Sequence, residues 1–156
     1  MPKKILFVCL GNICRSPAAE AVFLRKIKNE NLEDQYIVDS AGTGGWHVGR
    51  MADSRMRGAA LQRGISIESR ARQISSLDFE DFDLILTMDN SNLADVKSLS
   101  KQMTNSHKAT IKPILSYAKD TNLTEVPDPY YGGEKGFEDV LDLLEDAIDG
   151  LLLDFN

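Results

Sequence analysis

The sequence predicts an α/β fold in which residues 1–156 form a single domain, with helices on both faces of a four-stranded parallel sheet. The first observation behind this prediction is alternation, because four short apolar segments are separated by segments with apolar residues every three or four positions. The second is length, since 156 residues are enough for one sheet with its flanking helices. Such folds bind ligands at the carboxyl ends of the strands, so the loops that follow the strands are the expected functional region.

Four segments are expected to form the strands: Lys3–Cys9, 35–41, Leu84–Thr87 and 110–114. The first contains the run Ile5-Leu6-Phe7-Val8, which is typical of a strand buried on both faces. The fourth contains Pro113, which cannot donate a hydrogen bond to a neighbouring strand. Pro113 is therefore expected near the edge of the sheet or the end of its strand.

Five helices are expected, at 17–31, 53–63, a short segment from 75 or 76, a segment after 89, and 136–153. Asp53 and Asp89 are the expected N-caps of the second and fourth helices, and Gly64 is the expected stop of the second. Residues 98–109 are polar and predict the tail of the fourth helix followed by a loop. Arg70 and Arg72 form a basic cluster that is expected to be a solvated face.

Composition excludes several classes of protein. A net charge of −6 and a pI near 4.9 argue against binding nucleic acid or an acidic membrane surface. Only 2 cysteines are present, which argues against a disulfide scaffold and for a reducing compartment. No apolar stretch approaches the length of about 20 residues that a membrane span needs. We therefore expect a cytoplasmic protein.

The first strand is connected to the first helix by the octet Cys9-Leu10-Gly11-Asn12-Ile13-Cys14-Arg15-Ser16. The backbone amides of such a loop can point inward at the positive end of the helix and form an anion site of phosphate size. Gly11 and Asn12 are residue types that tolerate left-handed backbone angles, which a loop folded around an anion needs. Residues 10–15 are therefore expected to bind phosphate.

Three side chains of the octet fit phosphoryl transfer. Cysteines at helix N-termini beside arginine ionise readily, so Cys9 is expected to be a thiolate nucleophile at neutral pH. Arg15 offers a planar fork that can hold two phosphoryl oxygens at once. Ser16 is expected either to cap the helix or to hydrogen-bond the Cys9 sulfur.

The two cysteines are also compatible with simpler interpretations. Cys9 beside a buried strand is compatible with a core residue, and the C-x4-C pair is compatible with a disulfide or half a metal site. A zinc site would need His47 and His107 as its remaining ligands, and neither has finger-like spacing. The complete octet between a strand and a helix favours the phosphate-binding interpretation.

Two further loops carry candidate site residues. Trp46 lies in the glycine-rich stretch 43–49, where it has little apolar company and is expected to form a pocket wall. Asp128 lies between two prolines, and it is either part of a rigid surface turn or a general acid held over the loop after the first strand. Because Cys9, Ser40 and Asp128 follow or end strands of a parallel sheet, they are expected to converge on one edge.

The chain resembles the low-molecular-weight protein tyrosine phosphatases over nearly its whole length. The matching motifs are C-L-G-N-I-C-R-S-P, D-S-A-G after the second strand, A-R-Q-I at 71–74, M-D-x-x-N at 88–92, and D-P-Y-Y near the end. Together they are highly specific, although C-x5-R alone also occurs in other phosphatase folds. The resemblance implies a flavodoxin-like, Rossmann-like fold and hydrolysis of phosphotyrosine and small aryl phosphates, including acid phosphatase activity.

The resemblance also implies roles for the matching residues. Cys9 would form a phosphocysteine intermediate, Arg15 would clamp the phosphate, and Asp128 would protonate the leaving phenol and later deprotonate water. The loop would be supported by Asn12, Ser16 and Ser40. The substrate cleft would be lined by Ile13, Trp46, Tyr130 and Tyr131. Relatives often carry histidines in the region of 66–70, where this chain has none.

The implied partners are phosphotyrosine proteins, inorganic phosphate and oxyanion inhibitors such as vanadate, and the protein would be a monomer or weak dimer. No cofactor or metal is expected, because loop amides and Arg15 would compensate the phosphoryl charge. By the same resemblance, Cys14 would be a redox partner that protects Cys9 through a disulfide. The alternative is that Cys14 is a small buried side chain, and the sequence favours neither.

Three rival functions remain. An arsenate reductase of the same fold would need further cysteines to move a disulfide outward, and only Cys9 and Cys14 are present. A phosphoarginine phosphatase is the second rival, and its relatives carry threonine where Ile13 stands; Ile13 suits a phenyl ring better. The third is a phosphopeptide-binding module without turnover, which the presence of Cys9, Arg15 and Asp128 disfavours.

Overall fold

The computed structural model describes residues 1–103 and 107–155, without the side chains of Tyr131 and Glu134. The strands are β1 (Lys3–Cys9), β2 (Tyr36–Gly42), β3 (Leu84–Thr87) and β4 (Thr110–Pro113). The helices are α1 (Arg15–Asn29), α2 (Ser54–Gln62), α3 (Ser76–Asp81), α4 (Asn90–Lys101) and α5 (Gly133–Phe155). Three short 3-10 turns are η1 (Glu33–Gln35), η2 (Ile114–Tyr117) and η3 (Pro129–Tyr131).

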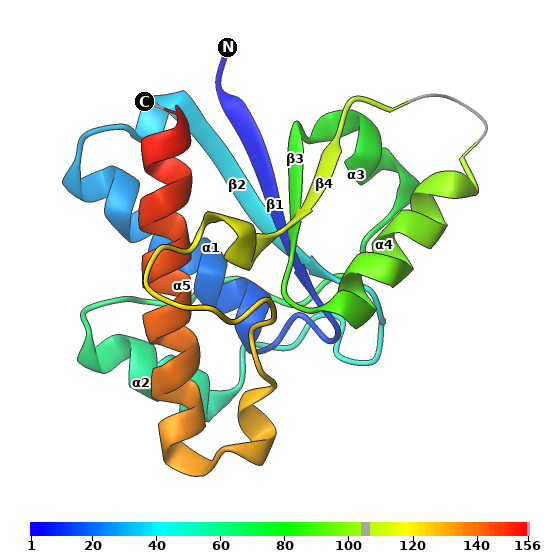
Figure 1. The fold of residues 1–156 in the computed structure, drawn as a ribbon. Coiled ribbons are helices and arrows are strands. Elements are labelled where there is room, and N and C mark those ends of the chain that lie inside the picture. Colours follow the sequence, from blue (N-terminus) through cyan, green and yellow to red (C-terminus); the bar gives the residue numbers. More distant parts are fainter. Residues whose placement is uncertain (104–106, 156) are drawn as a thin grey trace.

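The strands form one parallel sheet in the order β2-β1-β3-β4, which confirms the predicted fold class (Figure 1). From β1 the chain moves outward to β2, and from β3 it moves in the opposite direction to β4. The order therefore reverses between β1 and β3, and ligands bind outside the strand ends at such a switch point. Pro113 ends the edge strand β4, as expected.

Two apolar cores lie on opposite faces of the sheet. Figure 1 shows α1 and α5 on one face and α3 and α4 on the other. Successive β1 residues point to opposite faces, so Ile5 and Phe7 belong to the larger core with α1 and α5, while Leu6 and Val8 pack in the smaller core. This double burial explains the unbroken apolar run in β1.

Most of the predicted helix signals are confirmed. Asp53 and Asp89 are N-caps, and each accepts a backbone hydrogen bond within the first turn of its helix. The short helix begins at Ser76, and Gly64 has the left-handed φ of 75° that ends α2. The tail of α4 ends at Lys101, and residues 104–106 of the predicted loop lie outside the described residues.

Other expectations were wrong. The first helix begins at Arg15 rather than 17 and the last at Gly133 rather than 136, because both start inside loops whose composition hides the helix. The N-cap of α1 is Cys14, so of the two roles expected of Ser16 the hydrogen bond to the Cys9 sulfur is the one observed. Arg72 is not part of a solvated face, since it is partly buried and ion-paired with two carboxylates, whereas Arg70 is exposed.

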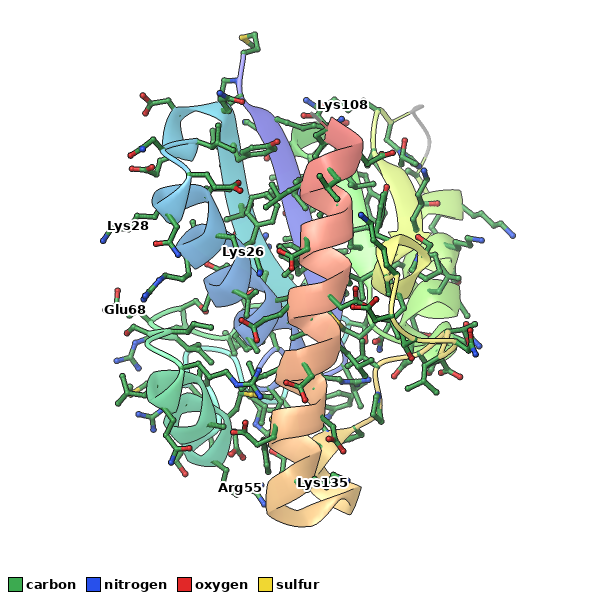
Figure 2. The ribbon with its side chains drawn as sticks, turned by 60° about the vertical axis from the view of Figure 1, so that its left-hand side comes forward. Lys26, Lys28, Arg55, Glu68, Lys108 and Lys135 are labelled. Atoms are coloured by element: carbon green, nitrogen blue, oxygen red, sulfur yellow. The ribbon has the colours of Figure 1, made fainter. Side chains whose placement is uncertain are left out.

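Helices α1 and α5 lie against each other along the larger core, and Lys26 of α1 reaches Asp149 of α5 at 2.7 Å (Figure 2). No helix in the described part of the chain is both long enough and apolar enough to span a membrane.

A pair of glycine substitutions tests the packing of α5. A Cβ on buried Gly150 would lie 1.9 Å from the Tyr117 carbonyl oxygen, whereas a Cβ on Gly58 of α2 meets nothing within 4 Å. We expect Gly150→Ala to lower the free energy of unfolding by about 1–3 kcal/mol through overpacking. Gly58→Ala should raise it by about 0.5–1 kcal/mol through helix propensity. Urea unfolding measures both, and a stabilising Gly150→Ala would contradict the tight α5–η2 contact.

Candidate active site

The loop between β1 and α1 is tied to its neighbours through its carbonyl groups. The carbonyls of Cys9, Leu10 and Ile13 accept backbone hydrogen bonds of 2.7–2.9 Å from residues 43, 44 and 53. Within residues 1–103 and 107–155, no protein group accepts a hydrogen bond from the amides of residues 11–14. These amides therefore remain available at the positive end of α1, which is an arrangement that binds anions.

Close packing shapes this loop. A Cβ on Gly42, the last residue of β2, would lie 2.8 Å from the Leu10 carbonyl oxygen and 3.1 Å from the Asn12 nitrogen. Asn12 adopts a left-handed backbone with φ of 57°, as its residue type suggested. Gly11 does not; instead its missing side chain leaves room for His47, whose Cδ2 would be 3.0 Å from a Cβ there.

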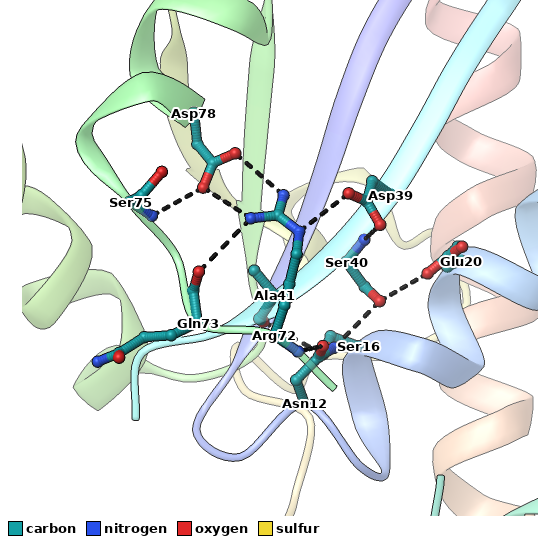
Figure 3. Close-up of polar contacts among 10 residues, drawn as sticks. All are labelled: Asn12, Ser16, Glu20, Asp39, Ser40, Ala41, Arg72, Gln73, Ser75 and Asp78. Carbon is teal, nitrogen blue, oxygen red and sulfur yellow. Dashed lines mark hydrogen bonds and ion pairs between the residues drawn. The ribbon is translucent and has the colours of Figure 1, made fainter. Parts of the chain in front are cut away.

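The Asn12 side chain connects the loop to the surrounding structure (Figure 3). Its Nδ2 donates to Ser16 Oγ at 2.8 Å and to Ser40 Oγ at 3.0 Å. Ser40 Oγ in turn donates to the Glu20 carboxylate at 2.6 Å. Burial raises the pKa of the Glu20 carboxyl, and the Ser40 hydrogen bond partly opposes this. Of the three residues expected to support the loop, Asn12 therefore contacts both Ser16 and Ser40, and Glu20 joins them through Ser40.

The Cys9 sulfur lies at the bottom of the loop, 3.0 Å from Ser16 Oγ. Cys9 is almost fully buried, with 3% of its surface exposed. Asn12 donates to the Ser16 oxygen, so the single Ser16 hydroxyl proton has two acceptors within reach, the Cys9 sulfur at 3.0 Å and the more distant Ala41 carbonyl at 3.4 Å. A donor in that position stabilises a thiolate.

Arg15 is held in one orientation by two acceptors. Its Nη1 donates to Asp89 Oδ2 at 2.8 Å and to the Val126 carbonyl at 2.9 Å, and only 5% of the residue is exposed. Among the described residues, these are the partners of its guanidinium, which leaves Nε and Nη2 for a bound anion. Asp89 thus has two contacts, since its other oxygen caps α4.

One cavity of about 100 Å³ opens above the loop. Its walls are Cys9, Leu10, Gly11, Ile13, Cys14, Arg15, Trp46, His47, Asp128, Pro129 and Tyr130. Larger hollows of about 470, 580, 370 and 290 Å³ lie elsewhere on the described part of the chain, but no cysteine lines any of these four. The small cavity is therefore the site where Cys9 could act, and Asp128 reaches it as the sequence led us to expect.

Asp128 is held on a rigid loop. Its Oδ1 accepts from the Tyr130 amide at 3.0 Å and caps η3. The loop rests on the start of α5, where a Cβ on Gly136 would lie 2.8 Å from the Pro129 carbonyl oxygen. Prolines on both sides of Asp128 further restrict its backbone. These contacts hold its carboxyl group at the cavity.

Two aromatic side chains, Trp46 and Tyr130, line the cavity. Trp46 is 71% exposed, and its ring lies over Gly44, where a Cβ would overlap it. The Tyr130 hydroxyl donates to Asp53 Oδ2 at 3.1 Å, while the Arg55 guanidinium lies 4.8 Å from the Tyr130 ring centroid. Figure 2 shows Arg55 near the start of α5. The side chain of Tyr131, also expected in the cleft, lies outside the described residues.

The surroundings of Cys14 favour its neutral thiol. Burial, with a further contribution from the Asp53 carboxylate, raises the pKa of the Cys14 thiol to about 12. A hydrogen bond with Tyr130 opposes this shift. Burial is also the main cause that raises the pKa of Tyr130, while the Arg55 hydrogen bond lowers the pKa of Asp53. Both cysteines are free thiols.

The sequence interpretation missed several residues of the site. Glu20 lies in the second turn of α1 and carries no motif of its own. Asp89 was assigned only as a cap, although its place after β3, next to β1, was a signal for the site. His47 was considered only as a zinc ligand, although it follows Trp46 in the same loop. In the described part of the chain, no three His, Cys, Asp or Glu side chains are grouped to hold a metal ion.

Comparison with known proteins gives consistent matches. The family model of the low molecular weight phosphotyrosine protein phosphatases matches residues 4–156. A putative low molecular weight protein-tyrosine-phosphatase of Synechocystis is 47% identical over 149 residues, covering 96% of this chain and 94% of its own.

Solved structures agree with this match. A protein tyrosine phosphatase of Entamoeba histolytica superimposes with a TM-score of 0.92 at 48% identity, covering 98% of this chain and 96% of its own. The Drosophila arginine phosphatase superimposes with a TM-score of 0.93 at 35% identity, covering 98% of both chains.

The raised pKa of Cys14 leads to a test of thiol reactivity. In the Cys9→Ser variant, Cys14 is the remaining cysteine, and we expect it to stay unmodified by iodoacetamide at pH 8 because it is protonated and buried. Intact-mass spectrometry measures the modified fraction, and the same protein unfolded in urea is the control that should react fully. Rapid modification of the folded variant would contradict the buried, neutral thiol.

Proposed function

The chain belongs to the low molecular weight phosphotyrosine protein phosphatases, and on this premise we propose that it hydrolyses phosphotyrosine in proteins, and small aryl phosphates, through a phosphocysteine intermediate. The observation that carries the proposal is the meeting of Cys9, Arg15 and Asp128 around one cavity of about 100 Å³. The available amides of residues 11–14 lie at the same end of α1 as Cys9 and supply the anion-binding surface.

In the first step, the Cys9 thiolate attacks phosphorus. A sulfur–phosphorus bond forms while the bond from phosphorus to the phenolic oxygen breaks, and Asp128 gives its proton to that oxygen. Acid assistance matters because a phenolate has a conjugate-acid pKa near 10 and is a poor leaving group. Arg15, oriented by Asp89, and the loop amides hold the phosphoryl oxygens as their charge redistributes.

In the second step, water attacks the phosphocysteine. Asp128, now a carboxylate, takes a proton from the water while the water oxygen forms a bond to phosphorus. The sulfur–phosphorus bond breaks, and inorganic phosphate is released. The Ser16 hydroxyl, 3.0 Å from the sulfur, stabilises Cys9 as it leaves as a thiolate. Asn12 and Ser40 keep the loop in shape through both steps.

The walls of the cavity favour an aromatic substrate. Trp46 and Tyr130 stand at its rim and Ile13 lies within its lining, so that a phenyl ring meets apolar surface above the phosphate site. Phosphoarginine is the competing substrate, because the Drosophila arginine phosphatase has a similar fold at 35% identity. A guanidinium group would gain less from Ile13 than a phenyl ring does.

Cys14 has two possible roles at this site. As a redox partner it would close a disulfide with an oxidised Cys9 and so protect it from irreversible oxidation. Its raised pKa weakens it as an attacking thiol at neutral pH, which favours the role of a buried lining residue. Mass spectrometry after mild peroxide separates the two, since a 9–14 disulfide supports protection and sulfinic Cys9 opposes it.

The remaining expectations extend the proposal. Phosphotyrosine proteins would be the substrates, and inorganic phosphate and vanadate would bind the loop as product and as phosphate mimic. The enzyme would act in the cytoplasm as a monomer or weak dimer, without a cofactor.

Turnover of p-nitrophenyl phosphate tests the proposal. We expect the wild-type protein to hydrolyse it in the presence of EDTA and Cys9→Ser to be inactive while remaining folded by circular dichroism. Phosphotyrosine, phosphoserine and phosphoarginine peptides are then compared, with phosphotyrosine expected to give the highest kcat/KM. Normal turnover by Cys9→Ser would refute the mechanism, and a preference for phosphoarginine would support the competing function.

Asp128→Ala tests the general acid. We expect kcat for phenyl phosphate to fall by about 10²–10⁴-fold with a much smaller change in vanadate affinity, because Asp128 moves protons and does not hold the anion. The loss should be smaller for p-nitrophenyl phosphate, whose leaving group needs less protonation. Asp81→Ala removes an exposed carboxylate from α3 as the matched control. Equal losses in affinity and turnover would reassign Asp128 to loop structure.

A further inference from the structure

Four residues beside the phosphate-binding loop form a closed ring of hydrogen bonds (Figure 3). Asn12 Nδ2 donates to Ser40 Oγ at 3.0 Å, and the Ser40 amide donates to Asp39 Oδ1 at 2.8 Å. Arg72 Nε donates to Asp39 Oδ2 at 3.0 Å, and the Arg72 amide donates back to Asn12 Oδ1 at 3.0 Å. The ring therefore joins the loop, the end of β2 and the segment that leads into α3.

Arg72 has contacts beyond the ring that fix its position. Its Nη1 and Nη2 each donate to the Asp78 carboxylate at 3.0 Å, so that its guanidinium bridges β2 and α3. Asp78 is 5% exposed and is itself held by the Ser75 amide at 2.8 Å. The Arg72 carbonyl accepts from the Gly42 amide at 2.9 Å. Because both its side chain and its backbone carbonyl are hydrogen-bonded, the position of the Arg72 amide is fixed.

That location determines the orientation of Asn12. Both ends of the Asn12 carboxamide are occupied, the oxygen by Arg72 and the nitrogen by Ser40 and Ser16. Ser16 in turn contacts the Cys9 sulfur. A displacement of the Arg72 amide would therefore move the Asn12 side chain, and Asn12 already has an uncommon backbone conformation with φ of 57°. Movement of Asn12 would in turn shift Ser16, which contacts the Cys9 sulfur.

We propose that Arg72 is a positioning residue for the phosphate-binding loop, and that it acts by bridging Asp39 and Asp78 so that its own amide fixes Asn12. Arg72 is absent from the lining of the catalytic cavity. Its contribution is to keep the loop amides and Ser16 in the geometry that binds a phosphoryl group. This inference rests on the proposed function, because it concerns the same site.

Arg63 provides a matched control for the ordinary structural effect of an arginine. Its guanidinium binds three carboxylates of α5, those of Glu138, Asp142 and Glu145, at 2.6–2.9 Å. Its side chain is 21% exposed, compared with 33% for Arg72. Loss of Arg63 removes a comparable set of ion pairs without touching the ring.

The experiment compares Arg72→Gln with Arg63→Gln and the wild-type protein. For each we measure melting temperature, kcat/KM for p-nitrophenyl phosphate, and the vanadate concentration dependence of the melting temperature, which reports affinity without turnover. We expect both variants to melt at lower temperature. Arg72→Gln alone should weaken vanadate binding and lower kcat/KM, each by about tenfold, as for residues coupled in one network.

Asp39→Asn is the second variant, because it removes the Arg72 Nε contact while keeping an oxygen for the Ser40 amide, and it covers the case in which Arg72→Gln does not fold. It should weaken vanadate binding in the same direction. The positioning role is refuted if both ring variants lose thermal stability but keep wild-type vanadate affinity. A wild-type protein that binds vanadate but does not turn over substrate would count against the proposed function alone.

Discussion

The candidate site depends on one residue in an uncommon backbone conformation. Asn12 turns the chain with φ of 57°, a conformation that costs on the order of 1 kcal/mol for a residue with a side chain. Three hydrogen bonds of its carboxamide offset that cost: Nδ2 donates to Ser16 and Ser40, and Oδ1 accepts from the Arg72 amide. The result is a loop with its carbonyls bonded outward and its amides available at the end of α1. An anion site of this kind needs no cluster of lysines, which is why it occurs in a chain of net charge −6.

The charged groups around the loop divide into two kinds. Arg15 is buried and paired with Asp89 on one edge, so the pair orients the guanidinium while leaving donors for a ligand. Arg55 is exposed and paired with Asp53, which holds the hydroxyl of Tyr130 at the cavity rim. In the proposed mechanism, the Arg15–Asp89 pair orients a guanidinium toward the phosphate. The Arg55–Asp53 pair supports the cavity wall against which the rest of a substrate would lie.

Much of the fold could be predicted because its signals are local. The unbroken run in β1, the caps Asp53 and Asp89, and Gly64 each reflect the chemistry of a few neighbouring residues. The octet could be identified because one continuous segment supplies the proposed nucleophile Cys9, the proposed clamp Arg15 and the loop amides. The predicted starts of α1 and α5 were wrong because the segments around Arg15 and Gly133 lack the residue pattern typical of a helix.

The parts of the site that could not be predicted are those made by distant segments. Arg72 looked like a solvated basic residue because one partner, Asp39, lies 33 residues earlier on β2 with α2 in between, and the other, Asp78, lies in the following helix α3. Glu20 and His47 contribute to the site only because β2 and the 43–49 loop lie beside the loop between β1 and α1 in the folded protein. Such contacts depend on the tertiary fold, which no short window of sequence reports.

The order of these segments along the chain has a consequence for biosynthesis. Residues 9–16 are translated well before Val126, whose carbonyl orients Arg15, and well before the Asp128 loop and the start of α5 on which that loop rests. A ribosome-bound chain that stops before residue 126 lacks both of these contacts. On the proposed mechanism, such an unfinished polypeptide would not dephosphorylate its neighbours.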